Sequence, residues 1–355
     1  MQDLESKNIL VAPLNWGLGH ATRCIPIIKA LLSENYKPIL ASDGDALLLL
    51  QKEFPTLKCL ELPSYNITYS KKGSNFKKKL IKDSPHLLRT IRKEKEAIKE
   101  IVDSENIVGI ISDNRFGVRH KKIPSIFITH QLKVLSGKTT WLSTKLHQKI
   151  ISKFDVCWVP DHEDEHNLSG DLSHGRFNHI LVKYIGPLSR FNKRETEIVY
   201  DLMVLLSGPE PQRTYLEQKL LDALSSYSGK VLFVRGKFEE QQKKKTTRNI
   251  SVYNYMTSFQ LEDAINQSAL VLSRSGYTTI MDLAKLEKRA FFIPTPGQYE
   301  QEYLAQLLDR KKIVPYCHQE DFELKMLNDT IGFSGFVNHN NTMSLKGLFR
   351  LFEGE

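Results

Sequence analysis

Short apolar runs alternate with amphipathic, helix-period segments along nearly the whole chain, and this alternation constrains the fold more than any other feature. In the first half, the pattern predicts strands at 8–12, 38–41, 108–112, 125–129 and 156–159 and helices at 25–34 and 46–54. In the second half, it predicts strands at 202–206, 231–234, 269–273 and 290–294 and helices at 213–226, 259–266, 278–286 and 299–308. The order of elements indicates an α/β fold built on parallel sheets.

The length of 355 residues indicates two domains, each large enough to bury its own core. A strand-like run is interrupted by Gly186 and Pro187, and we place the boundary there. We therefore expect a Rossmann-like N-terminal domain over 1–188 and a Rossmann-like C-terminal domain over 189–355, facing one central cleft. The last helix could pack back on the first domain. Ligands of such folds bind beyond the carboxyl ends of the strands, so the loops after the strands should carry the chemistry.

Cysteine usage and apolar content indicate a cytoplasmic protein. The four cysteines lie far apart and form no CxxC pair, which favours a reducing compartment and no cysteine-based metal site. The polar N-terminus MQDLESKNIL predicts no signal peptide. No apolar run approaches the length needed to cross a bilayer, so any membrane contact should be peripheral.

The positive charge is concentrated in the first half of the chain. Residues 1–190 hold 29 Lys and Arg against 20 Asp and Glu, and the segment Lys71 to Lys99 alone has 11 basic and three acidic side chains. Such a run is either a solvated helix face or a contact for an anionic surface. Leucine and isoleucine recur between the lysines, whereas Phe76 is the only aromatic residue. This favours an anionic lipid surface and disfavours nucleic acid as the partner.

A glycine-containing loop follows the first expected strand. Gly17 and Gly19 permit a tight turn and a close approach of the backbone to a ligand, and the helix after them would favour an anion or a developing charge. His20 follows directly, and the ordinary pKa of histidine suits a general base. A lone histidine is more often structural, but the position at a strand end favours a functional one.

Three further polar residues lie at the ends of neighbouring expected strands. Asp113 follows the strand 108–112 and could orient His20 as the carboxylate of a catalytic triad does, or could cap the next turn. His130 and Gln131 end the following strand at the same rim.

The second half carries the residues suited to a nucleotide. Ser207 and Gly208 connect a strand to a helix, where backbone N–H groups could hold a phosphate. The stretch from Ser273 to Gln306 contains a small-residue turn, a helix opening with threonines and an acidic residue. Its turn amides and hydroxyls could bind phosphates, and its acid could bind ribose hydroxyls; the residues are Ser275, Gly276, Thr278 and Asp282. Gln301 and Glu302 suit sugar hydroxyls.

Two metal-like patterns have simpler interpretations. His162 to His166 matches HExxH, but it follows a strand and Pro160, so we interpret it as a polar surface turn. Asp43 to Asp45 resembles a DxD motif, and we interpret it as a helix cap. We expect no metal site and no cofactor.

The segment from Ser273 to Gln306 resembles the donor-binding segment of GT-B glycosyltransferases. It is most similar to the glycosyltransferase family 28 type, which includes the bacterial lipid-intermediate N-acetylglucosaminyltransferases, and it is also similar to plant UDP-glycosyltransferases. The resemblance implies Asp282 on the uridine ribose, Met256 beside uracil, and Gln301 with Glu302 on the donor sugar. It places Gly17, Gly19, Ser207 and Gly208 in the phosphate loops, His20 and Asp113 as the catalytic dyad, and His130 and Gln131 on the acceptor side.

The sequence therefore predicts an inverting, metal-independent glycosyltransferase that uses a UDP-sugar as co-substrate. Its acceptor would be lipid-linked or a glycan, and Arg274 with helix N-termini would stabilise the leaving diphosphate. Two alternatives stay open. The string from Gly17 to Cys24 also resembles a nucleotide-sugar hydrolase of GT-B fold, and a non-catalytic module that binds nucleotide-sugars or membrane surfaces would carry the same segments.

Overall fold

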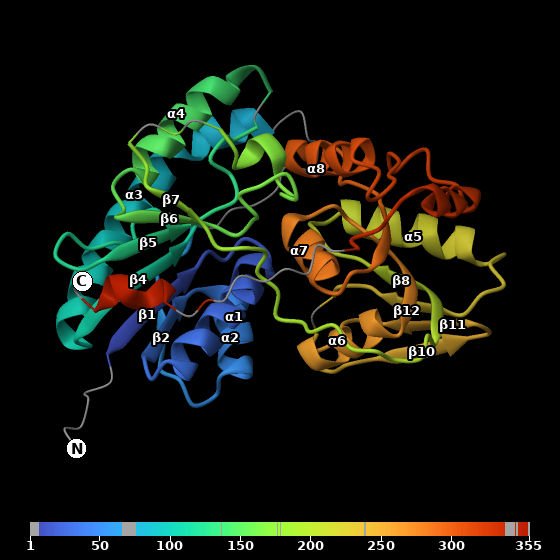
Figure 1. The fold of residues 1–355 in the computed structure, drawn as a ribbon, viewed down its shortest axis with the longest axis horizontal. Coiled ribbons are helices and arrows are strands. Elements are labelled where there is room, and N and C mark those ends of the chain that lie inside the picture. The colour runs from blue at the N-terminus through green and yellow to red at the C-terminus, as the bar shows by residue number, and fades with distance from the viewer. Residues whose placement is uncertain are drawn as a thin grey trace. The chain divides into compact units, whose positions relative to one another are not determined.

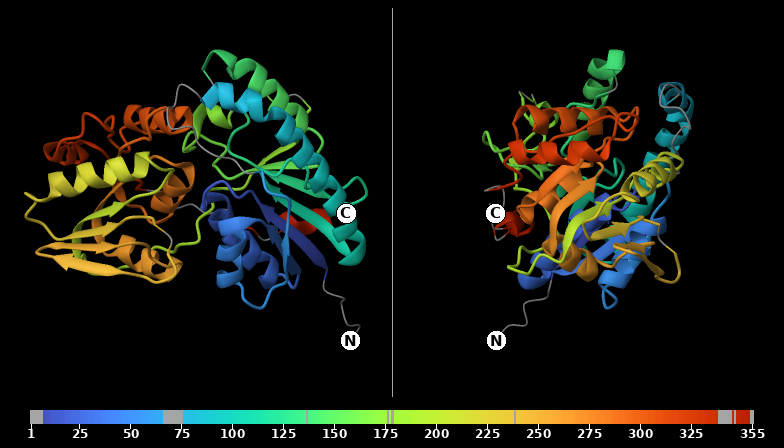
Figure 2. Two further views of the ribbon diagram at one scale, coloured as in Figure 1. Left: turned by 180° about the vertical axis from the view of Figure 1, so that it is seen from behind. Right: turned by 90° about the vertical axis from the view of Figure 1, so that its right-hand side faces the viewer.

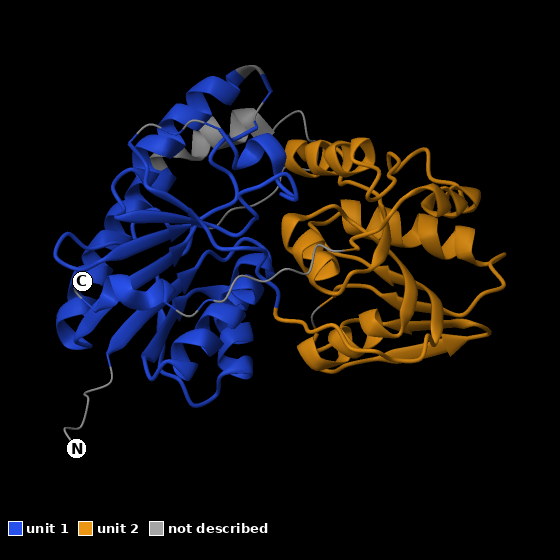
Figure 3. Ribbon diagram, viewed as in Figure 1, with its two compact units in different colours: residues 1–68, 77–189, 342–355 blue, residues 69–76, 190–341 orange. Residues whose placement is uncertain are grey.

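The computed structural model forms two compact units, each built around its own sheet (Figure 3). It describes residues 7–65, 76–135, 137–175, 177, 179–237, 239–337, 345 and 347–353. Unit 1 comprises residues 1–68, 77–189 and 342–355, and unit 2 comprises residues 69–76 and 190–341. The C-terminal residues thus cluster with the N-terminal domain.

Unit 1 is a seven-stranded parallel sheet with the strand order β3-β2-β1-β4-β5-β6-β7 (Figure 1). Its strands are β1 Asn8–Pro13, β2 Lys37–Ser42, β3 Cys59–Glu61, β4 Ile107–Asp113, β5 Ser125–Ile128, β6 Val156–Val159 and β7 Val182–Tyr184. Its helices are α1 Gly19–Ser33, α2 Gly44–Glu53, α3 Phe76–Ser104 and α4 Thr140–Ile151, with 3-10 turns at Gly137–Thr139, Gly170–Leu172 and Leu348–Phe352. The order is that of a Rossmann-like sheet, and its direction reverses between β1 and β4.

Helices and the returning C-terminus cover the first sheet. Ile98 and Val102 of α3 pack on Leu10 and Ile110, and the view from behind shows α3 crossing that face (Figure 2). The 3-10 turn Leu348–Phe352 packs against β4 at Gly109. A Cβ at Gly109 would lie 2.2 Å from a ring carbon of Phe352. Glycine at this position therefore makes room for the returning C-terminal segment.

Unit 2 is a six-stranded sheet with the order β10-β11-β9-β8-β12-β13, in which only β10 runs antiparallel to its neighbour. Its strands are β8 Tyr200–Leu205, β9 Val231–Val234, β10 Lys244–Thr247, β11 Ile250–Tyr253, β12 Ser268–Ser273 and β13 Arg289–Phe292. Its helices are α5 Gln212–Leu224, α6 Ser258–Asn266, α7 Tyr277–Lys285 and α8 Tyr299–Arg310, with a 3-10 segment at Leu324–Gly332. The order of the parallel strands again reverses, between β8 and β12.

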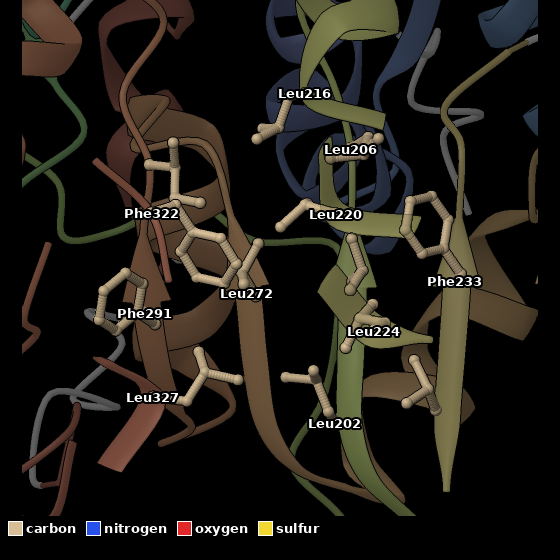
Figure 4. Packing of buried hydrophobic residues seen from close by; sticks show 13 residues of the cluster. Leu202, Leu206, Leu216, Leu220, Leu224, Phe233, Leu272, Phe291, Phe322 and Leu327 are labelled. Carbon is tan, nitrogen blue, oxygen red and sulfur yellow. The ribbon is translucent and has the colours of Figure 1, made fainter. Parts of the chain in front are cut away.

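Leucine and phenylalanine side chains fill the core of unit 2. Figure 4 shows Leu216, Leu220 and Leu224 of α5 pointing toward side chains from the strands of this sheet. Phe322 and Leu327 close the same cluster from the C-terminal side. This packing holds α5 and the strand ends of β8 and β12 in fixed register, and these strand ends carry the predicted phosphate loops.

The structure confirms the predicted α/β class with its parallel sheets and differs from the sequence prediction in some elements. Helix α1 begins at Gly19, six residues before the apolar periodicity indicates. Its first turns contain polar residues that are buried because Arg23 forms an ion pair with Asp113, so they do not show the apolar pattern of a buried helix face. The hairpin of β10 and β11 was not predicted, since β10 is the exposed polar sequence KKTT. Within the described residues, no helix is long and apolar enough to cross a membrane.

Candidate active site

The predicted site residues of unit 1 meet at the point where the strand order reverses. Pro13, the last residue of β1, pairs with Asp113, the last residue of β4, and Asp113 pairs with Ile128 of β5. Ligands of open α/β sheets bind at this point, beyond the carboxyl ends of the strands. His20 lies at the start of α1, directly after β1, and His130 lies two residues after β5.

His20 and Asp113 are in direct contact. His20 Nδ1 lies 2.8 Å from Asp113 Oδ1, with the His20 side chain 14% exposed and that of Asp113 fully buried. Because the carboxylate accepts a hydrogen, this bond favours the tautomer with the proton on Nδ1 and leaves Nε2 free to accept a proton. The Asp113 carboxylate thus binds His20, which favours the orienting role over the alternative in which Asp113 caps the following turn.

Arg23, which the sequence interpretation did not select, holds the other side of Asp113. Its Nε and Nη2 donate to the two carboxylate oxygens, and its side chain is 1% exposed. Although burial alone would raise the pKa of Asp113, the charges of Arg23 and His20 and their hydrogen bonds lower it to about 2. Burial first, and then the charge of Arg23, lower the pKa of His20 below 6.5, while Asp113 acts in the opposite direction. The signal available in the sequence was spacing, because His20 and Arg23 lie three apart on one helix face.

His130 belongs to the same cluster. Arg23 Nη1 lies 3.2 Å from His130 Nδ1, and His130 is 6% exposed. Gln131 is half-buried, and its backbone N–H donates to Thr129 Oγ1. The structure thus joins three of the predicted residues, His20, Asp113 and His130, through one arginine.

The glycine loop provides an open helix N-terminus. Gly17 has a φ of +69°, a conformation that favours glycine, and a Cβ there would meet no atom within 4 Å. Gly19 is the first residue of α1, and the N-cap Leu18 provides no side-chain cap to this helix. The backbone of this turn is therefore suited to approach by an anionic or charge-developing group.

Three loops converge at the reversal point of unit 2. Ser207 and Gly208 follow β8, Arg274 to Gly276 follow β12, and Thr295 follows β13. Gly208 has a φ of +100°, and a Cβ built there would lie 3.6 Å from Thr295 Oγ1. Thr295 is 2% exposed, and its hydroxyl has no hydrogen-bond partner among the described residues. Such a buried, unpartnered hydroxyl beside a glycine loop indicates a missing polar partner, and sequence reasoning did not select it.

Arg274 lies beneath these loops rather than at their surface. Its Nη1 donates to the carbonyls of Ile293 and Pro294, and its Nη2 donates to the Gln212 carbonyl and to Gln319 Oε1. All four acceptors are neutral, and Nε has no partner among the described residues. Burial lowers the pKa of Arg274 to about 10. Arg274 is thus a buried positive charge at the carboxyl edge of the sheet, with its two terminal nitrogens bound to the protein.

The residues predicted around the diphosphate and sugar also organise the local backbone. The buried Ser275 hydroxyl donates 2.8 Å to the Gln301 carbonyl, which ties the β12 loop to α8. Gln301 Oε1 accepts from the Thr295 N–H and Glu302 Oε1 accepts from the Gly297 N–H, each at 2.9 Å. Glu302 also lines a small cavity, together with Pro294, Pro296, Gly297, His318, Gln319 and Glu320. These side chains therefore shape the loop before α8, and Glu302 also contributes a wall of the cavity.

The remaining predicted donor residues lie on or near the first turns of two helices. Gly276 is the N-cap of α7, and a Cβ there would meet no atom within 4 Å, so its surroundings are open. Thr278 and Asp282 lie half-buried on α7. Met256 lies half-buried between β11 and α6, directly before the Thr257 capping box.

The two metal-like sequence patterns have structural explanations. His162 and His166 lie in a turn that is organised by Asp161, whose carboxylate accepts from the His162 and Leu168 N–H groups. Asp43 does stand at the N-cap position of α2, as the helix-cap interpretation predicts, but its side chain makes no cap hydrogen bond. Its carboxylate instead contacts Arg115 at 2.7 Å and Asn15 at 3.1 Å, because the fully buried guanidinium needs an anionic partner. Among the described residues, no three His, Cys, Asp or Glu side chains are placed to hold a metal ion.

The basic segment is partly a core element. Lys71 to Asn75 and the side chains of residues 76–85 lie outside the described residues, so the structure does not describe Leu80 and Ile81. Farther along α3, Leu88 is exposed and Glu94 is fully buried, bound to Arg115. One of the three acidic charges of the segment is therefore internal, which leaves a more positive outer face.

Comparison with known proteins defines the class first. MurG from Acinetobacter baumannii shares the fold, with a TM-score of 0.58 and 12% identity over 98% of each chain. UGT2 of Phytolacca americana, solved with UDP-2fluoro-glucose and pterostilbene, has a TM-score of 0.62 and 13% identity over 99% of this chain and 91% of that one. The fold is therefore that of the GT-B glycosyltransferases, as the sequence resemblance implied.

The family of the second half follows from sequence. Residues 213–339 match the model of the Glycosyltransferase family 28 C-terminal domain. The Haemophilus ducreyi UDP-N-acetylglucosamine--N-acetylmuramyl-(pentapeptide) pyrophosphoryl-undecaprenol N-acetylglucosamine transferase is 22% identical over 183 residues, 50% of this chain and 48% of that protein. The alignment thus spans about half the length of this relative.

Proposed function

We propose that this protein is a glycosyltransferase that moves a sugar from a UDP-sugar to an acceptor hydroxyl, with inversion and without a bound metal. The His20–Asp113 contact at the carboxyl edge of unit 1 is the observation that carries the proposal. His20 Nε2 takes the proton of the acceptor hydroxyl as its oxygen attacks the anomeric carbon. The bond from that carbon to the diphosphate breaks, and UDP leaves with the bonding electrons.

Unit 2 binds the donor in this proposal. The family 28 domain match and the convergence of the β8, β12 and β13 loops support this role. The diphosphate contacts the backbone at Gly208 and Gly276 and the unpartnered hydroxyl of Thr295. Asp282 binds the ribose, Met256 lies beside uracil, and Gln301 with Glu302 bind the sugar. These assignments use backbone and side-chain groups that lie at one edge of one sheet.

Arg274 replaces the charge of a metal ion at the leaving group. Its guanidinium is buried among neutral acceptors, so an anion bound nearby would relieve an uncompensated charge. It acts through its field and by fixing the loops, since Nη1 and Nη2 already bind the protein. The N-termini of α5 and α7 add their dipoles in the same place.

The acceptor is lipid-linked, and the enzyme works at an anionic membrane surface of the cytoplasm. Helix α4 supports this proposal, because Trp141, Leu142 and Leu146 are 72%, 61% and 60% exposed. Lys145 lies over the Trp141 ring, Lys149 follows one turn later, and the helix sequence contains no acidic residue. An exposed stripe of tryptophan, leucine and lysine suits the interface of an anionic bilayer. The relatives named for an undecaprenol-linked substrate support the same class of acceptor.

The test is turnover of UDP-sugars with lipid-linked and glycan acceptors in the presence of EDTA. We expect UDP release to depend on the acceptor, to persist in EDTA and to require His20. His166→Ala, in the exposed turn after β6, is the matched control and should keep full activity. UDP release at an unchanged rate without any acceptor would instead establish a nucleotide-sugar hydrolase. An absence of turnover, combined with nucleotide binding, would establish a non-catalytic module.

A further inference from the structure

We propose that Arg23 is the positioning residue that neutralises Asp113, keeps His20 uncharged and joins His130 to the catalytic pair. The inference rests on the proposed role of His20 as the base. It differs from a simple histidine–aspartate dyad, in which the carboxylate stands alone and favours the protonated histidine. Here a buried cation lies against both partners of the dyad.

The contacts of Arg23 define this role. The guanidinium grips both oxygens of Asp113 through Nε and Nη2, a bidentate arrangement that fixes the plane of the carboxylate. The same Nη2 lies 2.9 Å from His20 Nδ1, and Nη1 lies 3.2 Å from His130 Nδ1. One side chain on the second turn of α1 thus touches three residues from the ends of three adjacent strands.

Donor and acceptor chemistry then sets the proton positions. A guanidinium has only donors, so His130 Nδ1 must accept, and His130 is a neutral ring with its proton on Nε2. At His20, Nδ1 faces both Arg23 Nη2 and Asp113 Oδ1. Arg23 Nη2 already donates to Asp113 Oδ1, and the carboxylate is the acceptor of the two groups, so it receives the Nδ1 proton of His20. The Nε2 atom of His20 therefore has a free electron pair.

Charge accounting explains why this base stays neutral. Among the described residues, Arg23 and Cys24 on α1 contact this pair, and His130 after β5 contacts Arg23. Asp113 and Arg23 cancel, His130 is neutral, and burial raises the pKa of the Cys24 thiol. A proton on His20 would therefore add an uncompensated positive charge beside Arg23, in a site that is almost closed to water. Removing Arg23 leaves the Asp113 charge unopposed and favours protonation of His20.

The test is an NMR titration of the histidine rings in the ligand-free protein, for wild type, Arg23→Gln and Arg23→Lys. In Arg23→Gln we expect the His20 ring to titrate at higher pH than in wild type. In Arg23→Lys, which keeps the charge but loses the fork, His20 should titrate near the wild-type value while the His130 Nδ1 resonance changes. A folded Arg23→Gln protein with an unchanged or lower His20 midpoint would overturn the proposal.

A second comparison covers the case in which Arg23→Gln does not fold, because it leaves Asp113 buried without a cation. Asp113→Asn and the double variant Arg23→Gln/Asp113→Asn differ only in the presence of Arg23. We expect His20 to titrate at higher pH in the double variant, and equal midpoints would reject the role of Arg23. For each protein, kcat/KM at about pH 5.5 is divided by the plateau kcat/KM of the same protein. This ratio should be about tenfold lower for Arg23→Gln than for wild type. The titration needs no turnover, so its failure is separate from failure of the proposed function.

Discussion

The two candidate sites lie at equivalent places in two similar sheets but consist of different chemical groups. At the reversal point of unit 1, the ion pair of Asp113 and Arg23 and the imidazole of His20 lie almost closed to water. At the reversal point of unit 2, the loops offer glycine backbone and a buried hydroxyl, and the buried guanidinium of Arg274 is turned inward. Preorganised charge suits proton transfer, whereas open backbone suits binding of a phosphate chain. The difference predicts that substitutions in unit 1 change turnover and those in unit 2 change donor affinity.

The largest expected effect is on turnover. His20→Ala removes the proposed base, and kcat should fall by about 10²- to 10⁴-fold, the usual contribution of general base catalysis. The affinity for UDP should not change, since His20 belongs to unit 1. Steady-state kinetics and calorimetric titration of UDP measure the two quantities. Weaker UDP binding with an unchanged kcat would contradict the assignment of turnover to unit 1 and of donor binding to unit 2.

Acid should weaken unit 1 first, because buried groups with displaced pKa values lie there. Burial lowers the pKa of His147 to about 4, and its Nε2 has no partner among the described residues. The folded state therefore resists a proton that the unfolded chain accepts. Stability that is present above pH 6.5 is lost as the pH falls to about 4, which amounts to about 3 kcal/mol. Asp113, with its lowered pKa, adds a further loss as the pH falls from 3.8 to about 2.

His147→Asn tests this expectation, because asparagine keeps a polar group at the Nδ1 position and does not titrate. The variant should show a smaller fall in unfolding free energy between pH 6.5 and 4 than wild type. Hydrogen exchange should show that α4 and β5 lose protection before β8 and β12 in wild type. Simultaneous loss in both units would contradict an acid weakness specific to unit 1.

A matched pair of glycines sharpens the donor side of the comparison. Gly276 has an ordinary φ of −71° and open space around its Cβ position, so Gly276→Ala should leave the melting temperature unchanged. A methyl group there would occupy space proposed for the diphosphate, and we expect UDP to bind about tenfold more weakly, about 1.4 kcal/mol. Gly208→Ala, at a φ of +100°, should instead lower the melting temperature as well. Full UDP affinity in Gly276→Ala would remove this turn from the donor site.

Sequence periodicity predicted most of the elements that place both sites. Strands such as Val156–Val159 and Val231–Val234 are uniformly apolar because both faces of a parallel sheet are buried, so their bounds are readable. β10 has an exposed polar sequence and gives no such signal. The pairing of His20 with Asp113 was predictable because the sequence placed both at the ends of expected strands, and the carboxyl ends of parallel strands share one edge.

Contacts made across the fold were not predictable in this way. Arg23 is 90 residues from Asp113, and an arginine on a helix ordinarily faces solvent. Glu94 was counted as one charge of a surface run, yet it is fully buried because Arg115, Tyr65 and the Gly117 N–H surround it. Burial of a charge depends on a partner far away in sequence, and local pattern carries no information about that partner.

The smallest expected effect concerns membrane binding by the exposed stripe of α4 in unit 1. Each lysine near an anionic bilayer contributes about 1 kcal/mol, so Lys145→Ala or Lys149→Ala should weaken binding to anionic vesicles about fivefold. Lys37→Ala, at the exposed start of β2, is the control and should bind as wild type does, because β1 and β4 separate β2 from β5 in the sheet. The interaction is electrostatic, so raised salt should reduce binding of wild type toward that of the variants. Co-sedimentation with anionic and neutral vesicles at low and high salt measures these differences. Equal binding to both vesicle types would mean that the exposed stripe of α4 does not recognise an anionic bilayer. The preference for a lipid-linked acceptor over a soluble one would then lose its structural support.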